Sequence, residues 1–459
     1  MNDNNPLNTS LTRRGVFRLG GGIALSAGMT ALLAACTPGS ASGGGAGSGT
    51  LTFMNRWSDP TSKKNAQALF DAFTKSSGIK VANQTQPSSG DTYQPAVRNA
   101  FSSSNPPSMA TDISGPEIYN LAKAGVLMDL TSIANGKLKG RLQAGATAGA
   151  ELDGKVWGLS DGANVGNCVW VNHDYLAKYK VSDSDVKDLE SWIAAMTEIK
   201  KAGGTPVVIG AKDQWPGGHY LNDLVQRRLG STNATALYNR SVVKGAPDTV
   251  KWTDDQVVKA FEDYLLFKPV FQDGFLGEAS ATTDSLFLSG QAGFYEMGSW
   301  FLSGIRQNKP SFDIGVLLFP EVTGGKGTGK EVTLGNDTII VSAKADKDHV
   351  EQFFEYFTEP ATLAKWAGDQ FIAPPYNYDT SKVKIADSTL KGLFADVNKF
   401  SADAGPDGAA LFNDQAIDVN IYTKYIWQGS VGLMSGDVAP DQLAQQLEDA
   451  TVAAQEKLS

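Results

Sequence analysis

The sequence predicts an α/β protein with two lobes, each a mixed sheet flanked by helices. Strand-like and helix-like patterns alternate along most of the chain, and this alternation is typical of parallel or mixed sheets. Residues 50–459 form the body, which is too long for one ordinary hydrophobic core and long enough for two. Hydrophobic residues make up 41% of the chain, as expected for a globular protein.

The N-terminal segment predicts export. Arg13 and Arg14 precede a short apolar stretch at 19–35, which ends directly before Cys36. Paired arginines, a short apolar core and small residues before a cysteine are typical of a twin-arginine signal, although the general export route stays open. We expect 1–35 to be the signal peptide. An ordinary signal with a chance cysteine is one alternative, and a membrane-spanning helix is another, which the glycines of this stretch disfavour.

The end of the signal resembles that of bacterial lipoproteins, in which the chain is cut before a cysteine that carries lipid. The resemblance implies lipidation of Cys36 and anchoring to the outer face of the cytoplasmic membrane. Residues 36–49 are rich in glycine and serine, so we expect a flexible tether. The predicted mature chain has a net charge near −11, because the whole chain carries −9 and the signal carries +2. That charge argues against a nucleic-acid binder.

The first part of the body alternates strand and helix signals. A strand is predicted at 51–53, and a second strand begins at Ile79. Between them, apolar residues recur at the spacing of one helical face: Ala66, Leu69, Phe70 and Phe73. Gly78 is expected to end this helix. Further on, Pro116 opens a short helix that Gly125 closes.

The middle of the body repeats this alternation. Apolar periodicity predicts a helix from Leu189 to near Gly203, a second helix around 257–261, and strands at 206–210, 292–295, 314–318 and 338–341. After residue 341 the chain becomes largely helical, and its last helix follows Pro440. The sequence has no repeat of 20 to 50 residues, which argues against a solenoid.

Several stretches, in order along the chain, resemble the carbohydrate-binding proteins of ABC importers, the family that includes maltose-binding protein. They are Gly154–Ser160 followed by Val169–Asn172, Phe287–Phe294 followed by Gly298–Trp300, Ile314–Pro320, and Leu334–Ile340, which resembles a glycine-rich turn before a strand. The resemblance implies a periplasmic-binding-protein-like fold, in which crossing hinge strands join two discontinuous lobes around a ligand cleft. We place the first lobe at 50–159 plus 319–365 and the second at 160–318 plus 366–459.

Aromatic residues beside polar ones follow three of the predicted strands. In open α/β sheets, ligands bind beyond the carboxyl ends of the strands. A flat aromatic ring contacts the apolar face of a sugar, and carboxylates or amides bind its hydroxyls. The candidate ligand residues are Trp57, Asp112, Asp213, Trp215, Glu296, Trp300, Asn336 and Tyr376. The family resemblance implies that Trp300 is a stacking tryptophan and that Asp112 accepts hydrogen bonds from sugar hydroxyls.

Each candidate also has a structural interpretation, because a tryptophan after a strand can simply cover the core. Trp170 and Trp192 are expected in the core, and Cys168 is expected to be a buried thiol. The three histidines lie in no zinc motif, and no nucleophile elbow or phosphate-binding loop is present in the sequence. We therefore predict neither a metal nor a cofactor.

The favoured function is binding without catalysis. We expect a monomer that captures a carbohydrate, a neutral oligosaccharide, between its lobes and delivers it to the membrane subunits of an ABC permease. One alternative is a lipid-anchored glycosidase or polysaccharide lyase that uses two carboxylates. Another is a binder of a peptide, a polyamine or a metal chelate. An anionic ligand would require arginines near helix starts, whereas the candidates here are mainly tryptophans and acids.

Overall fold

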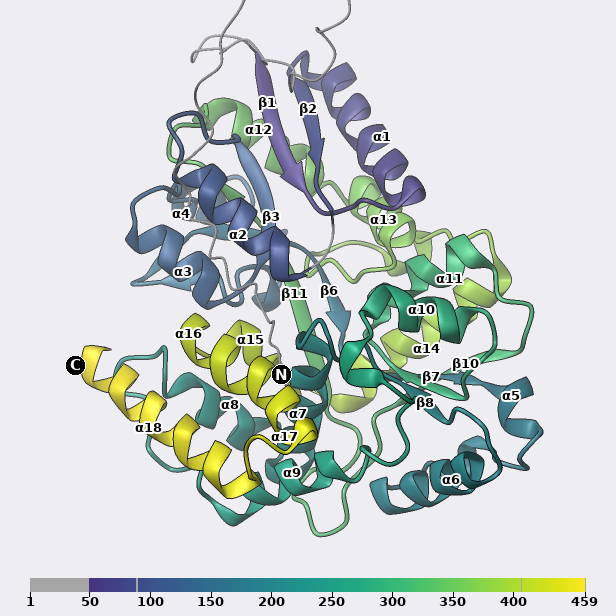
Figure 1. The fold of residues 1–459 in the computed structure, drawn as a ribbon. Coiled ribbons are helices and arrows are strands. Elements are labelled where there is room, and N and C mark those ends of the chain that lie inside the picture. The colour runs from purple at the N-terminus through teal and green to yellow at the C-terminus, as the bar shows by residue number, and fades with distance from the viewer. Residues whose placement is uncertain (1–48, 88–89, 406, 459) are drawn as a thin grey trace, which may run out of the picture. The chain divides into compact units, whose positions relative to one another are not determined.

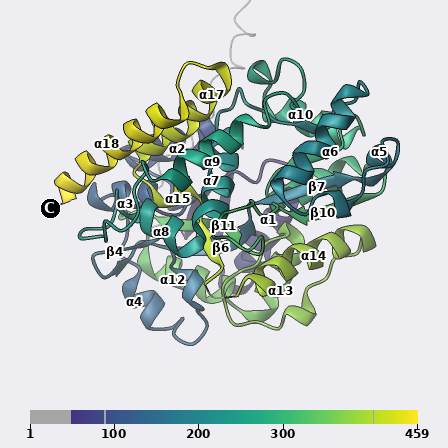
Figure 2. The same cartoon turned by 90° about the horizontal axis from the view of Figure 1, so that it is seen from below.

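The computed structural model describes residues 49–87, 90–405 and 407–458. Within them the chain forms two mixed sheets of six and four strands, and helices flank both sheets (Figures 1 and 2). The predicted signal at 1–35, Cys36 and nearly all of the predicted tether lie outside the described residues. Among the described helices, none is both long and apolar enough to cross a membrane.

The six-stranded sheet lies mainly in the upper lobe in Figure 1, and one end of it reaches the lower core. Its order is β12-β11-β3-β1-β2, and β6 also pairs with β11. The strands are β1 (Thr50–Asn55), β2 (Lys80–Thr85), β3 (Met109–Ile113), β6 (Gly158–Val165), β11 (Val332–Val341) and β12 (Ala409–Leu411). Parallel pairing joins β1 to β2 and β3, whereas β11 is antiparallel to β3 and β6.

Helices cover both faces of this sheet because its strands are apolar on both sides. They are α1 (Pro60–Ser77), α2 (Gly90–Phe101), α3 (Pro116–Lys123), α4 (Thr131–Asn135), α12 (Lys347–Phe357) and α13 (Pro360–Gln370). On one face Phe53 packs against Phe70 of α1 and Phe353 of α12, with ring centroids 5.1 and 5.8 Å away. On the other face Met54 joins a cluster with Tyr93 of α2. A short hairpin, β4 (Glu151–Leu152) and β5 (Lys155–Val156), precedes β6.

The turn after β1 is fixed by the cap of α1. The side chain of Asp59 accepts hydrogen bonds from the backbone N–H groups of Thr61 and Ser62, at 3.1 and 2.9 Å. The helix ends, as predicted, at Gly78, whose φ of 79° favours glycine. This cap holds the segment 56–58 at the carboxyl end of β1, where the candidate site lies.

The four-stranded sheet belongs to the lower lobe in Figure 1 and has the order β10-β7-β9-β8. Its strands are β7 (Cys168–Asn172), β8 (Val207–Val208), β9 (Phe294–Glu296) and β10 (Ile314–Leu318). The helices are α5 (His173–Ala177), α6 (Leu189–Lys201), α7 (Trp215–Leu229), α8 (Ser231–Asn239), α9 (Asp255–Leu265), α10 (Ser280–Leu288), α11 (Leu302–Asn308), α14 (Ser388–Ala404), α15 (Asn413–Ala416), α16 (Val419–Ile421), α17 (Gln428–Ser435) and α18 (Pro440–Leu458). A π-helical turn, Tyr422–Trp427, joins α16 to α17.

The core of this lobe surrounds α7, which is buried from its second residue to its last and contacts α8, α9, α15 and α17 (Figure 2). Trp192 packs edge-on against three phenylalanines. Trp170 and Trp192 are fully buried, which confirms the prediction that both are core residues. Cys168 is buried as predicted, and burial raises the pKa of its thiol well above the usual value.

The long strand β11 passes from one lobe to the other. It begins beside β12, where Val332 packs in the lower core, and it ends at Val341 in the upper core. The predicted strand at 338–341 is confirmed, but the glycine-rich turn expected before it is wrong, because residues 334–337 also lie inside β11. The strand is continuous because β6, β3 and β12 pair with it, and Gly335 leaves room for the ring of Phe412.

Candidate ligand-binding site

Four aromatic side chains of the lower lobe form a cluster where β9, β12 and α7 meet. We call Trp215, His219, Trp300 and Phe412 the aromatic cluster. Trp215 lies 4.9 Å from His219 and 6.4 Å from Trp300 between ring centroids, and His219 stacks on Phe412 at 4.1 Å. Trp215 and Trp300 are partly exposed. The structure thus brings together the two tryptophans that the sequence analysis placed after different strands.

The start of α7 positions Trp215. Gln214 has a left-handed φ of 66°, which is strained for a residue with a side chain. The N–H of Trp215 donates to the carbonyl of Asp213 at 2.7 Å, and Pro216 then occupies the first turn of the helix. Gly218 lies so close to Trp427 that a Cβ atom would come within 2.6 Å of its ring. A strained turn and a crowded first helical turn therefore fix the indole.

The upper lobe contributes charged side chains instead. We call Asp112, Asp161 and Asp337, with Arg56 between them, the acidic wall. Arg56 lies at the carboxyl end of β1 and forms an ion pair with Asp337 of β11. Asp161 lies at an irregularity in the β6–β11 pairing, next to the step between Asp337 and Thr338. The carboxyl ends of parallel strands and a β-bulge thus direct these groups to one place.

Burial changes the protonation of two acids of this wall. Asp112 is 1% exposed and Asp161 is 2% exposed. Burial, followed by repulsion from Glu117, raises the pKa of Asp112 well above its usual value. Burial, followed by repulsion from Asp337, does the same for the pKa of Asp161. In the described residues, Oδ2 of Asp112 has no hydrogen-bond partner, while Oδ1 accepts from the N–H of Ile113 at 2.9 Å.

Contacts join the acidic wall to the aromatic cluster. Trp300 and Phe412 lie beside Gly335, two residues before Asp337 on β11. On the opposite flank, the hydroxyl of Tyr422 donates to Oε1 of Glu117 at 3.1 Å, and both oxygens of Glu117 accept from Arg98.

Asp414 of α15 completes this flank. One of its carboxylate oxygens lies 3.7 Å from Nε2 of His219. Among the described residues, its other oxygen and Nδ1 of His219 have no hydrogen-bond partner. Trp300 and Phe412 of the aromatic cluster therefore lie beside β11, the strand that carries Asp337 of the acidic wall.

Two of the predicted acids occupy other positions in the lower lobe. Asp213 accepts from the N–H of Ser280 at 2.8 Å and so fixes the start of α10. Glu296 is 2% exposed, and burial followed by repulsion from Asp223 raises its pKa well above the usual value. Asp223 on α7 is fully buried, and burial raises its pKa to about 7. This acid pair lies inside the lobe rather than at the acidic wall.

The remaining three candidates, Asn336, Tyr376 and Trp57, form contacts within the protein. Asn336 is buried, accepts a hydrogen bond from the hydroxyl of Ser160 and donates to the carbonyl of Ala148 at 3.1 Å. Tyr376 is 1% exposed, and its hydroxyl donates to the carbonyl of Ser160. Trp57 is half-buried and stacks on Phe53 with centroids 5.5 Å apart.

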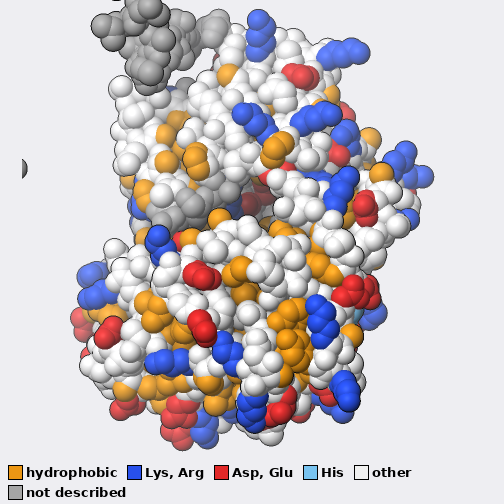
Figure 3. Space-filling model, turned by 45° about the vertical axis from the view of Figure 1, so that its right-hand side comes forward, with side chains coloured by type: hydrophobic (Ala, Val, Ile, Leu, Met, Phe, Trp, Pro, Cys, Tyr) orange, Lys and Arg blue, Asp and Glu red, His pale blue; other side chains and the backbone are white. Residues whose placement is uncertain are grey.

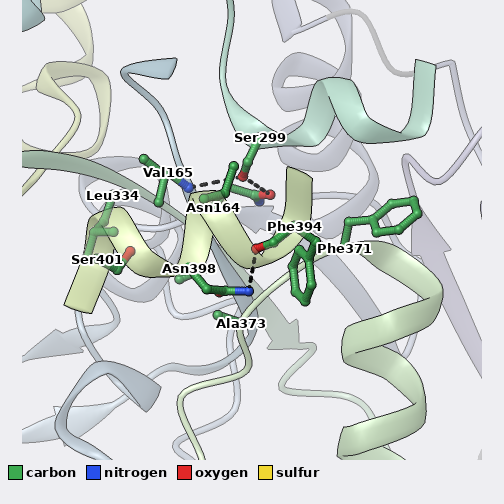
Figure 4. Close-up of a pocket in the computed structure, with 11 residues that line it drawn as sticks. Asn164, Val165, Ser299, Leu334, Phe371, Ala373, Phe394, Asn398 and Ser401 are labelled. Atoms are coloured by element: carbon green, nitrogen blue, oxygen red, sulfur yellow. Dashed lines mark hydrogen bonds between the residues drawn. The ribbon is translucent and has the colours of Figure 1, made fainter. Parts of the chain in front are cut away.

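The surface is hollowed between the two lobes in Figure 3, with acidic and basic side chains at the edge of the hollow. A separate small cavity lies between β6, β11 and α14 (Figure 4). Its volume of about 20 Å³ holds about one water molecule. Asn164 and Ser299 line it and are joined by a 3.3 Å hydrogen bond. A sugar does not fit there, so the candidate site is the hollow and not this cavity.

Sequence reasoning missed several residues of the site. Arg56 is not among the predicted ligand residues, and its position beside the candidate Trp57 after β1 was the available signal. Asp337 adjoins the candidate Asn336, and Asp161 lies beside the quoted motif ending at Ser160. Four further residues carried no local signal: Glu117, His219, Phe412 and Asp414. In the part of the chain described here, no group of three or more His, Cys, Asp or Glu residues is arranged to hold a metal ion.

Comparison with known proteins gives a consistent result. A family model described as bacterial extracellular solute-binding protein matches residues 57–364. A multiple sugar-binding protein of Streptococcus mutans is 27% identical over 290 residues, 61% of this chain and 59% of that protein. An uncharacterized ABC transporter extracellular-binding protein of Pyrococcus horikoshii is 20% identical over 302 residues, 64% of either chain. Both matches span less than two thirds of the relative's own length.

Solved structures share the fold. A chitin oligosaccharide binding protein superposes with a TM-score of 0.74 at 21% identity, over 89% of this chain and 99% of that one. A protein structure from work on xylan utilization by Caldanaerobius polysaccharolyticus gives a TM-score of 0.75 at 20% identity, over 87% and 99%. These matches confirm the predicted α/β fold with two lobes.

Proposed function

Because this chain belongs to the family of bacterial extracellular solute-binding proteins, we propose that it captures a carbohydrate between its two lobes and hands it to an ABC importer. The observation that carries the proposal is that the aromatic cluster lies beside β11, the strand that carries Asp337 of the acidic wall. Indole faces contact the apolar face of a sugar ring, while buried carboxylates accept hydrogen bonds from its hydroxyls. The name of the sugar-binding relative from Streptococcus mutans also supports a sugar ligand.

The proposed ligand residues include four of the predicted candidates and four residues of the acidic wall and the aromatic cluster that the sequence did not predict. They are Trp57, Asp112, Trp215, Trp300, Arg56, Asp161, His219 and Asp337. We leave out Tyr376 and Asn336, because their polar atoms already bond within the protein. We also leave out Asp213, which fixes the start of α10, and Glu296, which lies with Asp223 inside the lower lobe.

The mechanism is closure of two discontinuous lobes on the ligand. β6 and β11 pair with each other and run from the core of one lobe to the core of the other, so a small change of twist in this pair moves one lobe against the other. A ligand stabilises the closed state only to the extent that it contacts both lobes. The aromatic cluster and the acidic wall come from different lobes and meet that requirement.

The family is extracellular, so the protein is exported. We further propose that a twin-arginine signal directs export, that Cys36 carries lipid, and that the mature protein works as a monomer on the outer face of the cytoplasmic membrane. The closed form would dock on the membrane subunits of the importer.

Titration calorimetry of the mature protein against a panel of sugars tests the proposal. We expect one equivalent of sugar to bind per chain and to be recovered chemically unchanged. Progressive conversion of the sugar would instead identify a carbohydrate-active enzyme. Absence of binding to every sugar, with binding of a peptide or polyamine, would overturn the carbohydrate assignment.

A further inference from the structure

We propose that the cleft prefers a saccharide that carries a protonated amine, and that Asp112 and Asp161 bind this amine. The inference rests on the proposed carbohydrate-binding function and narrows its ligand class. It replaces the expectation of a neutral sugar with that of an amino sugar or a similar basic saccharide.

The charge balance of the acidic wall is the first observation. Asp112, Asp161 and Asp337 all interact electrostatically with one guanidinium, that of Arg56, which is already paired with Asp337. No salt bridge joins Asp112 or Asp161 to a cation in the described part of the chain. The neighbouring Glu117 adds no surplus, because Arg98 binds both of its oxygens at 2.6 and 2.7 Å. The wall therefore has three acids and one cation, and burial favours the neutral form of Asp112 and Asp161 as long as no further cation is present.

Unpartnered polar atoms are the second observation. Most buried polar groups in proteins have hydrogen-bond partners, and an unpaired one is costly. Oδ2 of Asp112 has none among the described residues, although Asp112 is 1% exposed. The same holds, within those residues, for Nδ1 of His219 and Oδ1 of Asp414. Asp112 and His219 belong to the proposed ligand residues, so a bound ligand is an available partner for their atoms.

An ammonium group matches these atoms better than a hydroxyl. It brings a positive charge and three N–H donors, whereas a hydroxyl brings one donor. A hydrogen bond between ions is about twice as strong as one between neutral groups. The aromatic cluster adds attraction, since ring faces favour cations.

A divalent metal ion matches the site less well. Such an ion requires about six oxygen ligands, and no described group of three or more such residues has a suitable arrangement.

The raised pKa values of Asp112 and Asp161 agree with a missing cation. Burial favours the neutral acid, and a bound ammonium would favour the carboxylate and lower the pKa again. The charged or titratable groups around Asp112 are Arg56 on β1, Tyr93 and Arg98 on α2, Glu117 on α3, Asp337 on β11 and Tyr422 of the π-helical turn. Binding of an amine is therefore expected to release protons from the protein.

Matched sugar pairs test the inference by calorimetry on the mature protein at pH 7. The probes are the glucosamine trimer against the N-acetylglucosamine trimer, and galactosamine against galactose. We expect the amine member of at least one pair to bind about tenfold more tightly. Its affinity should fall with added salt, while that of the neutral member stays constant. Titration in two buffers of different ionisation enthalpy should reveal proton release with the amine member.

Two isosteric variants locate the effect. Asp112→Asn and Asp161→Asn keep the size of each side chain and remove its charge, so each should abolish most of the tenfold preference. Asp396→Asn is the matched control, because this exposed residue on α14 lies away from the cleft. Melting temperatures identify any variant that fails to fold, and the other variant then decides the test.

The outcomes separate this inference from the proposed function. Equal or tighter binding of the neutral member in every pair that binds would overturn the amine preference and leave the carbohydrate function intact. The same conclusion follows if only neutral sugars of the wider panel bind. A preference that survives both Asp variants would overturn the roles of Asp112 and Asp161. Failure of all sugars would overturn the proposed function itself.

Discussion

Two buried carboxylates in this protein, Asp112 and Glu448, have opposite protonation behaviour. Glu448 of α18 is 8% exposed, and its oxygens accept from the guanidinium of Arg240 at 2.6 and 2.8 Å and from the N–H of Trp252 at 2.9 Å. Burial alone would raise its pKa, but these bonds and the charge of Arg240 lower it overall. Asp112 forms no ion pair with any described residue, and burial raises its pKa. The ion pair with Arg240 therefore distinguishes the structural carboxylate Glu448 from Asp112.

The largest effect is expected at the satisfied carboxylate. Glu448→Gln removes a charge that binds Arg240 and should lower the free energy of unfolding by about 3–5 kcal/mol, the usual effect of breaking a buried pair. Urea denaturation measures this loss. Asp112→Asn is the matched comparison and should change the unligated stability by less than about 1 kcal/mol, because no ion pair is broken. Equal losses in the two variants would contradict the distinction between the two carboxylates.

A pH series sharpens the comparison. The pKa of Asp223 is raised to about 7 from 3.8, so its contribution to stability is complete below pH 4 and is lost as the pH rises to 7. Because the folded state keeps one proton that the unfolded state loses, the free energy of unfolding should fall by up to about 1.4 kcal/mol per pH unit in that window. Asp223→Asn should flatten this slope in urea titrations. Glu448 has a lowered pKa, so its contribution is present at neutral pH and lost on acidification. Both pKa assignments would be refuted if Asp223 proved to add stability as the pH rises and Glu448 proved to add stability as the pH falls.

The aromatic side of the site gives a smaller change. Trp300→Ala should weaken sugar binding at least tenfold, about 1.4 kcal/mol, because a stacking face is lost. The melting temperature without ligand should stay nearly unchanged, since Trp300 is partly exposed. Calorimetry and thermal unfolding measure the two quantities. Trp192→Ala provides the contrast, because it empties a fully buried site and should destabilise the apo protein. A large loss of apo stability in Trp300→Ala would assign that residue to the core.

The smallest change in stability is expected at Asp59, whose carboxylate accepts hydrogen bonds from backbone N–H groups. Asp59 caps α1 through Thr61 and Ser62. Asp59→Ala should cost about 1 kcal/mol of unfolding free energy, whereas Asp59→Asn retains the cap and should cost less. Chemical denaturation resolves this difference. If both variants lost the same amount, the charge facing Arg306 at 3.6 Å would matter more than the cap.

Much of the fold could be predicted from local patterns. Strand β10 spans the predicted 314–318, and Gly78 ends α1 as expected. Burial of Trp170 and Trp192 was also predicted, because apolar runs and helical periodicity depend only on neighbours in sequence. The turn expected before the strand at 338–341 failed for the opposite reason, since pairing of residues 334–337 with distant segments made them part of β11.

The site was predicted less completely because it depends on register between distant strands. Trp215 and Trp300 were found from their positions after strands, and they do lie together. Asp161 and Asp337 meet only through the irregular pairing of β6 with β11, which no local pattern encodes. The hydroxyl of Tyr376 turned inward for a similar reason, because a sequence does not reveal which side chains a distant backbone carbonyl will bind.

Cys168 has a practical consequence for measuring lobe closure. Its thiol is enclosed in the lower core and resists ionisation, so maleimide dyes should leave it unmodified in the native protein. With Cys36 exchanged for serine, one surface cysteine introduced in either lobe becomes the selective labelling position. A pair of such dyes would report the distance between lobes by fluorescence energy transfer, while Cys168 keeps its natural packing.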